Sequence, residues 1–203
     1  VTTTGTGANG VFACGDNAEA DLSNVTINAS ANGGHGVMAT QGGVIKCTNV
    51  DMTTNGANSG AIATDRGGGT ITYTGGTVTT TGSDSPGIYS TGTITVSGAT
   101  ISATGSEAAV IEGANNITLS NTTLSGSKKR GVMIYQSMSG DADGSTGTFT
   151  MTNGSITAEA GPAFYVTNAT GVINLTGTSE TASSGTLLDA SAGNWGTSGS
   201  NGG

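Results

Sequence analysis

The sequence of 203 residues has little of what a wide globular core or a disulfide framework needs. Only 33% of its residues are hydrophobic and 4% are aromatic, and it contains two prolines and two cysteines. Two cysteines cannot form a framework of several disulfides, and Cys14 and Cys47 lack the spacing of a metal site. They are predicted to be either two buried thiols or one bridge between neighbouring repeats. No run of 18 apolar residues occurs, so no membrane insertion is predicted in this segment.

Cations are also scarce, with five Lys and Arg against thirteen Asp and Glu, for a formal net charge of −8. This balance argues against nucleic acid as a partner, because phosphate binding needs clustered Lys and Arg. Three of the five cations form the run Lys128–Lys129–Arg130. We interpret it as a solvated turn between strands, with an anion or acidic-sugar contact as the alternative. The single histidine, His35, has no predicted catalytic partner and is interpreted as a loop residue.

A repeated phrase dominates what the sequence does contain. It reads small, apolar, apolar, small and recurs about eight times, at intervals of 22–32 residues, beginning at Gly10, Gly36, Gly60, Gly87, Ala109, Gly131, Ala163 and Thr186. A period of this length indicates one supersecondary unit stacked on itself. Each unit holds two more strand-like segments with polar–apolar alternation. Between them lies a corner of Asn or Gly, residues that tolerate left-handed backbone, at Asn24, Asn49, Gly75, Gly98, Asn121, Asn153 and Gly177.

These units predict an all-β fold, a right-handed parallel β-helix of about eight coils with three short strands per coil. Equivalent strands in successive coils would stack about 4.8 Å apart, and right-handed coiling is the default for parallel crossovers. The solenoid is predicted over residues 1–190, followed by a Gly/Ser/Asn-rich linker or tail at 191–203. In that tail, Trp195 either folds back to plug the last coil or is only a linker residue.

The Asn-containing corners and the Gly–apolar strands resemble those of the right-handed parallel β-helix proteins of the pectin-lyase-like superfamily. The corners that carry the resemblance are Leu22-Ser23-Asn24-Val25-Thr26-Ile27 and Leu119-Ser120-Asn121-Thr122-Thr123-Leu124. The Thr/Ser/Asn/Gly richness and low charge are more similar to bacterial surface, adhesin and autotransporter-passenger β-helices than to secreted pectinolytic enzymes. The resemblance implies that corner asparagines stack as a hydrogen-bonded ladder, which Gly75, Gly98 and Gly177 would interrupt. It is specific for the fold and weak for function.

The doubled apolar positions of the phrase raise a question of orientation, because successive side chains of a strand face opposite ways. If the first apolar residue of each phrase faces the core, the second forms an outward stripe: Phe12, Met38, Ile62, Tyr89, Ile111, Met133, Tyr165 and Leu188. An exposed stripe of this extent usually marks an interface or a ligand groove. The alternatives are that the stripe faces inward or that a loop covers it.

Two further surface features suggest other functions. Ranks of Thr-x-Thr, such as Thr70/Thr72 and Thr93/Thr95, resemble the faces of β-helical ice-binding proteins, although threonine is also a common residue of solvated strands. A polysaccharide-active enzyme would need paired carboxylates, for which Asp16 and Asp65 are the loose candidates. Asp141 and Asp143 offer weak oxygen ligands for Ca²⁺.

The sequence therefore predicts a non-enzymatic, extracellular or cell-surface scaffold that requires no cofactor. Its predicted partners are host or environmental glycans, or other copies of the chain docked end to end or side by side. End docking is considered because no capping helix is evident at either end of the solenoid. A polysaccharide lyase or hydrolase on the same fold is the alternative function, and ice binding is a remote one.

Overall fold

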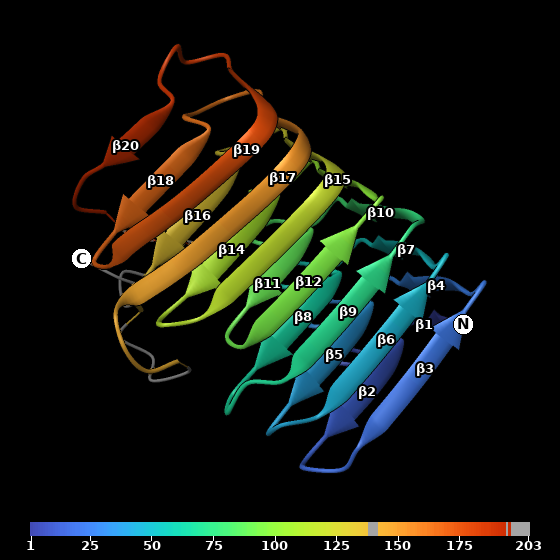
Figure 1. Cartoon of the computed structure of the whole chain (residues 1–203). Helices are drawn as coiled ribbons and strands as arrows, with labels where there is room; N and C mark the ends of the chain where they lie inside the picture. The colour runs from blue at the N-terminus through green and yellow to red at the C-terminus, as the bar shows by residue number, and fades with distance from the viewer. Residues whose placement is uncertain (138–141, 194, 196–203) are drawn as a thin grey trace.

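The computed structural model describes residues 1–137, 142–193 and 195. Its described elements are all strands, and they pair in parallel with the equivalent strands of neighbouring coils. The result is an all-β parallel solenoid of about seven turns (Figure 1), close to the predicted eight. The described ranges contain no helix of the length and apolarity needed to cross a membrane.

One wall of the solenoid is an eight-stranded sheet, built from the repeated phrase. Its strands, in spatial order, are β2 (Val11–Cys14), β5 (Val37–Thr40), β8 (Ile62–Asp65), β11 (Ile88–Ser90), β14 (Ala109–Glu112), β16 (Val132–Tyr135), β18 (Phe164–Thr167) and β20 (Leu188–Ala190).

The other two strand positions of each coil belong to a twelve-stranded sheet that bends at the Asn/Gly corners. One arm contains β3 (Glu19–Ser23), β6 (Val44–Thr48), β9 (Thr70–Thr74) and β12 (Thr93–Ser97). The second arm contains β1 (Thr2–Thr3), β4 (Thr26–Ala29), β7 (Asp51–Thr54), β10 (Thr77–Thr80) and β13 (Thr100–Ala103). In the later coils, one long strand runs through both arms: β15 (Asn116–Gly126), β17 (Thr146–Ala158) and β19 (Thr170–Ala182).

The corners confirm the left-handed backbone expected at Asn and Gly. The φ angle is positive at all seven predicted positions, from 48° at Asn121 to 69° at Gly75. The asparagine ladder is short: the amide of Asn49 lies 3.5 Å from Asn24 Oδ1, and that of Asn153 lies 3.5 Å from Asn121 Oδ1. Both pairs are exposed, so these asparagines stabilise the corners mainly because asparagine adopts the left-handed conformation more readily than most residues.

The core is a thin layer between the two sheets, as the scarcity of large side chains predicts. Inward columns from the eight-stranded sheet meet inward columns from both arms of the other. The core includes an edge-on pair of rings, Phe149 and Phe164, whose centroids lie 5.6 Å apart. Such pairs stabilise a core beyond their buried area.

The register of the repeated phrase differs from the prediction in three coils. Ile62 pairs with Val37, Ile111 pairs with Ser90, and Leu188 pairs with Phe164, so all three belong to inward-facing columns. Leu187 lies just before the first inward side chain of the last coil, whereas in the first seven coils a small residue takes this place: Gly10, Gly36, Ala61, Gly87, Ala108, Gly131 and Ala163. A Cβ atom on Gly36 would lie 2.7 Å from the Ala61 carbonyl oxygen and from Met52 Sδ. A Cβ atom at Gly36 would therefore require a neighbouring atom to shift, which accounts for glycine at this position.

Candidate functional site

The outer face of the eight-stranded sheet carries an outward column of side chains, here called the outer column. In register order it contains Phe12, Met38, Ala63, Tyr89, Val110, Met133, Tyr165 and Asp189. Five of the eight residues predicted to face outward are therefore in it, whereas Ile62, Ile111 and Leu188 are not. Phe12 is 54% exposed, but Tyr165 is only 5% exposed. The outer column is thus open in its first coils and covered in its later ones.

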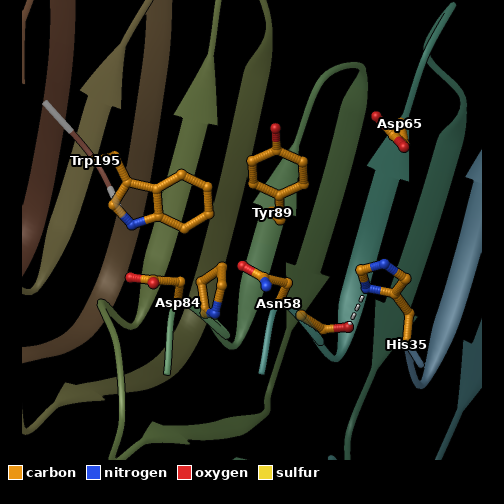
Figure 2. A pocket seen from close by; sticks show the side chains of 8 residues that line it. His35, Asn58, Asp65, Asp84, Tyr89 and Trp195 are labelled. Atoms are coloured by element: carbon orange, nitrogen blue, oxygen red, sulfur yellow. Dashed lines mark hydrogen bonds between the residues drawn. The ribbon is translucent and has the colours of Figure 1, made fainter. Parts of the chain in front are cut away.

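The covered part is a second apolar cluster, separate from the solenoid core. It contains Val110, Met133, Tyr135 and Tyr165, with Tyr89 and Trp195 packed against it. The indole of Trp195 lies nearly parallel to the Tyr89 ring, with centroids 5.6 Å apart, and 5.5 Å from the Tyr135 ring. Figure 2 shows the Tyr89 and Trp195 rings side by side. Trp195 thus packs on the sheet's outer face, an outcome that neither sequence-based alternative included.

A buried carboxylate anchors this covering. Glu107 is fully buried; its Oε2 accepts a hydrogen bond from Trp195 Nε1 at 2.8 Å, and its Oε1 pairs with Arg130 Nη1 at 2.9 Å. The guanidinium carbon of Arg130 also lies 4.2 Å from the centre of the Tyr165 ring. Lys129, the neighbouring cation, pairs with Asp84 at 2.6 Å. Two residues of the predicted basic run are therefore engaged in ion pairs, which argues against a free anion-binding turn.

A second buried carboxylate, Glu112, orients two of the aromatic rings through their hydroxyl groups. Glu112 accepts hydrogen bonds from the hydroxyl groups of Tyr89, Tyr135 and Ser137. Burial and the proximity of Tyr135 and Glu112 raise the pKa of Tyr89 well above its ordinary value. The Tyr89 hydroxyl therefore stays protonated and donates to Glu112, which fixes the orientation of the ring.

A pocket of about 160 Å³ lies where the open and covered parts of the outer column meet. It is lined by His35, Asn58, Gly60, Asp65, Asp84, Pro86, Tyr89 and Trp195 (Figure 2), and is here called the Gly60 pocket. Its position follows from two small residues in the third coil. Ala63 stands between Met38 and Tyr89 in the outer column, and Gly60 stands between His35 and Pro86 in the row before it. In both rows, the third coil therefore presents a smaller side chain than the coils on either side of it.

His35 borders this pocket, although the sequence suggested only a bystander in a loop. Its Nδ1 lies 2.9 Å from the Gly60 carbonyl oxygen, the geometry of an Nδ1–H donor. Its backbone N–H donates to Asn9 Oδ1 at 2.9 Å. Burial lowers the pKa of the imidazole, and the bond to Gly60 opposes that shift only in part. His35 is therefore neutral at physiological pH.

A second hollow, of about 540 Å³, continues along the open coils. It is lined by Gly7, Asn9, Phe12, Cys14, Met38, Thr40, Gln41, Asp65 and Arg66, and is here called the Phe12 groove. Asp65 lines both hollows, so the Phe12 groove and the Gly60 pocket adjoin at this carboxylate. Both combine apolar or aromatic side chains with carboxylate and amide groups.

The other predicted site residues lie apart from this region. Asp16 lies beside Gly42 and lines neither hollow, so it does not join Asp65 there. Asp141 is outside the described residues, and Asp143 is exposed. Among the residues that the structure describes, no group of three or more His, Cys, Asp or Glu side chains is arranged to hold a metal ion.

The two cysteines have different environments, and both are free thiols. Cys47 is buried, as one alternative predicted, and burial raises its pKa to about 12. Cys14 is exposed, with Sγ 3.6 Å from Gln41 Oε1, so the expectation of two buried thiols holds only for Cys47.

The threonine ranks lie on the outside of the twelve-stranded sheet, in register across four strands. Thr70, Thr93, Asn116 and Thr148 form one row, and Thr72, Thr95, Thr118 and Thr150 form the next. Lys46 and Asn174 border the second row at its two ends. This face is well separated from the outer column because it belongs to the opposite wall.

Comparison of the chain with protein-family models, with curated proteins and with solved structures found no match.

Proposed function

We propose that this chain is a non-enzymatic, extracellular β-solenoid scaffold that binds glycans on the outer face of its eight-stranded sheet. The observation that carries the proposal is the adjoining pair of hollows, the Phe12 groove and the Gly60 pocket. Sugar rings present apolar C–H faces together with hydroxyl groups. Aromatic rings pack against the apolar faces, and carboxylates and amides hydrogen bond with the hydroxyls.

The stacked architecture supports the scaffold role. Coils repeat the same backbone hydrogen bonds from one to the next, so the outer column is held on a rigid wall. Binding to such a preformed surface avoids the ordering cost that a flexible loop would incur. The low charge of the chain further favours an uncharged polar ligand over a phosphate-rich one.

The experiment is a binding screen of the whole chain against immobilised host, plant and bacterial glycans. We expect Phe12→Ser to weaken binding, because it removes the most exposed aromatic ring of the groove. Val172→Ser is the matched control, since Val172 is also an exposed apolar residue but lies in the last coil. Failure of the wild-type chain to bind any glycan, or equal binding by both variants, would contradict the proposal.

A polysaccharide-active enzyme is the second candidate, because Asp65 and Asp84 both line the Gly60 pocket. Glycosidases require two carboxylates at the scissile bond. The measurement is the release of reducing ends or unsaturated sugars from a polysaccharide panel, with and without a chelator. We expect none; turnover that disappears in Asp65→Asn and Asp84→Asn would replace the scaffold proposal with an enzymatic one.

A further inference from the structure

We propose that the Gly60 pocket is a terminal subsite, which holds the last ring of an uncharged glycan while the rest of the glycan runs along the Phe12 groove. This inference rests on the proposed glycan binding and adds which part of the ligand is recognised. It predicts that the protein binds the ends of glycans and not their internal segments.

The first argument is that the combined groove is closed at one end. Beyond Tyr89, the outer column continues with Val110 and Met133, both fully buried, and with Tyr165. Trp195 packs over this stretch and is itself held by Glu107. A polysaccharide lying along the column could therefore not continue past Tyr89. A groove that is open toward Phe12 and closed at Trp195 suits a chain end.

The second argument is size. Pockets for drug-sized ligands have volumes of roughly 300–1,000 Å³, whereas the Gly60 pocket has about 160 Å³. It has room for one ring-sized group, and the larger Phe12 groove adjoins it at Asp65. Figure 2 shows the aromatic rings at one end of the pocket and His35 with Asp65 at the other.

The third argument is charge. The residues lining the pocket include two carboxylates, Asp65 and Asp84, and no Lys or Arg. Asp84 pairs with Lys129 at 2.6 Å and Asp65 pairs with Arg66 at 3.9 Å, so the two negative charges are largely compensated, and no cation lines the pocket to attract a ring that bears its own carboxylate. The Asn58 amide and the carboxylate oxygens instead suit the hydroxyls of an uncharged ring.

The pocket is also preorganised. Glu112 fixes Tyr89 through its hydroxyl, and Lys129 holds Asp84 at 2.6 Å. Neither the aromatic surface nor this carboxylate needs to be ordered by the ligand, which lowers the cost of binding.

The test is a substitution at Gly60 that fills the Gly60 pocket and leaves the backbone in place. A Cβ atom on Gly60 would lie 3.4 Å from the Pro86 oxygen and from Tyr89 Cβ, which is ordinary contact, and the backbone there is not left-handed. Gly60→Leu should therefore fill the pocket, and Gly60→Ala is the matched control. On glycans that the wild type binds, we expect Gly60→Leu to lower affinity about tenfold or more and Gly60→Ala to change it by less than about twofold.

A second variant removes a polar contact. Asn58 has a φ of 53°, so Asn58→Gly keeps the left-handed backbone while deleting the amide. It should lower affinity even if Gly60→Leu fails to fold, as judged by its circular dichroism and melting temperature. Trimming the glycan's terminal residue with an exoglycosidase should also abolish binding.

The outcomes separate this inference from the proposal beneath it. If Phe12→Ser weakens binding while Gly60→Leu and Asn58→Gly do not, the glycan occupies the groove alone and the terminal subsite is wrong. Binding that survives exoglycosidase treatment would also overturn it. Failure of the wild type to bind any glycan would overturn glycan binding itself.

Discussion

At the scale of single residues, the strongest constraints lie outside the solenoid core, on the outer face of the eight-stranded sheet. Glu107 and Glu112 are buried carboxylates that between them contact Arg130, Trp195, Tyr89, Tyr135 and Ser137. Removing one partner of a buried charge leaves the other without compensation, which costs more than the pair itself contributes.

Arg130→Met should therefore destabilise the chain, since it leaves Glu107 buried without its cation. We expect the free energy of unfolding to fall by about 3 kcal/mol, toward the lower end of the range for broken buried pairs because Arg130 is partly exposed. Urea denaturation measures this loss. Lys128→Met is the control, because Lys128 is the exposed neighbour in the same run. Equal losses in the two variants would contradict the role assigned to the pair.

Because His35 is desolvated by burial, we expect the stability of the chain to depend on pH. Burial lowers the folded-state pKa of His35 below the ordinary value of 6.5, so the unfolded chain binds a proton that the folded chain does not. Its contribution is therefore unaffected above pH 6.5 and becomes increasingly destabilising as the pH falls below it. Asp65 and Asp84 line the same pocket, so the informative quantity is the difference between the variant and the wild type. The melting temperature of His35→Gln should fall less than that of the wild type between pH 7.5 and pH 5.5; identical slopes would refute this.

At the scale of elements, the corners decide where each strand of the twelve-stranded sheet bends. β12 and β13 are separate strands around Gly98, whereas β15 runs through Asn121, yet both corner residues have positive φ. The later coils therefore bend within one strand: β15 pairs with β17 in the same register on both sides of the corner, and only Asn121 and Asn153 themselves are left out of the pairing. The early coils have three strands each, and the later coils have two.

Asn121→Ala tests the corner directly. A residue with a Cβ other than Asn or Asp pays about 1–2 kcal/mol in the left-handed conformation, and Asn121 has a φ of 48°. We expect the free energy of unfolding to drop by that amount in a chemical denaturation curve. Asn121→Gly should restore most of it, since glycine adopts this conformation freely. A glycine variant as unstable as the alanine variant would show that the exposed Asn ladder matters more than the backbone.

At the scale of the whole molecule, the two ends of the solenoid differ from its middle. The large hydrophobic residues that are exposed, among those described, are Val1, Phe12, Val172, Leu187 and Leu188, and all belong to the first or last coils. The strands there also have a neighbour on one side only, as Figure 1 shows for β20 and for β2. Open strand edges with apolar side chains favour further β pairing.

For this 203-residue chain taken by itself, we predict that copies associate end to end at high concentration. Sedimentation velocity and electron microscopy would distinguish isolated rods from continuous fibres. Leu187→Lys combined with Leu188→Lys should shift the distribution toward single rods, because charged side chains protect open edges. A wild-type chain that stays monodisperse at every concentration would contradict end docking.

The candidate site was only partly predictable. Phe12, Met38, Tyr89, Met133 and Tyr165 were correctly placed on the outer face, because alternation along a strand is a local property. Two of the three register errors arose where the phrase has a second small residue beside the true one: Gly60 beside Ala61, and Ala109 beside Ala108. A column of small residues at the entry to the strands of the first seven coils was the signal that would have resolved these two. Leu188 follows Leu187, so its position carries no such signal.

The sequence by itself determined the stacking of parallel coils, the thin core and the left-handed corners, since each depends on a pattern that recurs within one coil or from one coil to the next. Only the tertiary structure decided which outer residues are covered. The bond between Trp195 and Glu107 joins residues 88 positions apart, and no period predicts such a contact. The same holds for the Gly60 pocket, which exists because two small residues of one coil stand between large residues of its neighbours.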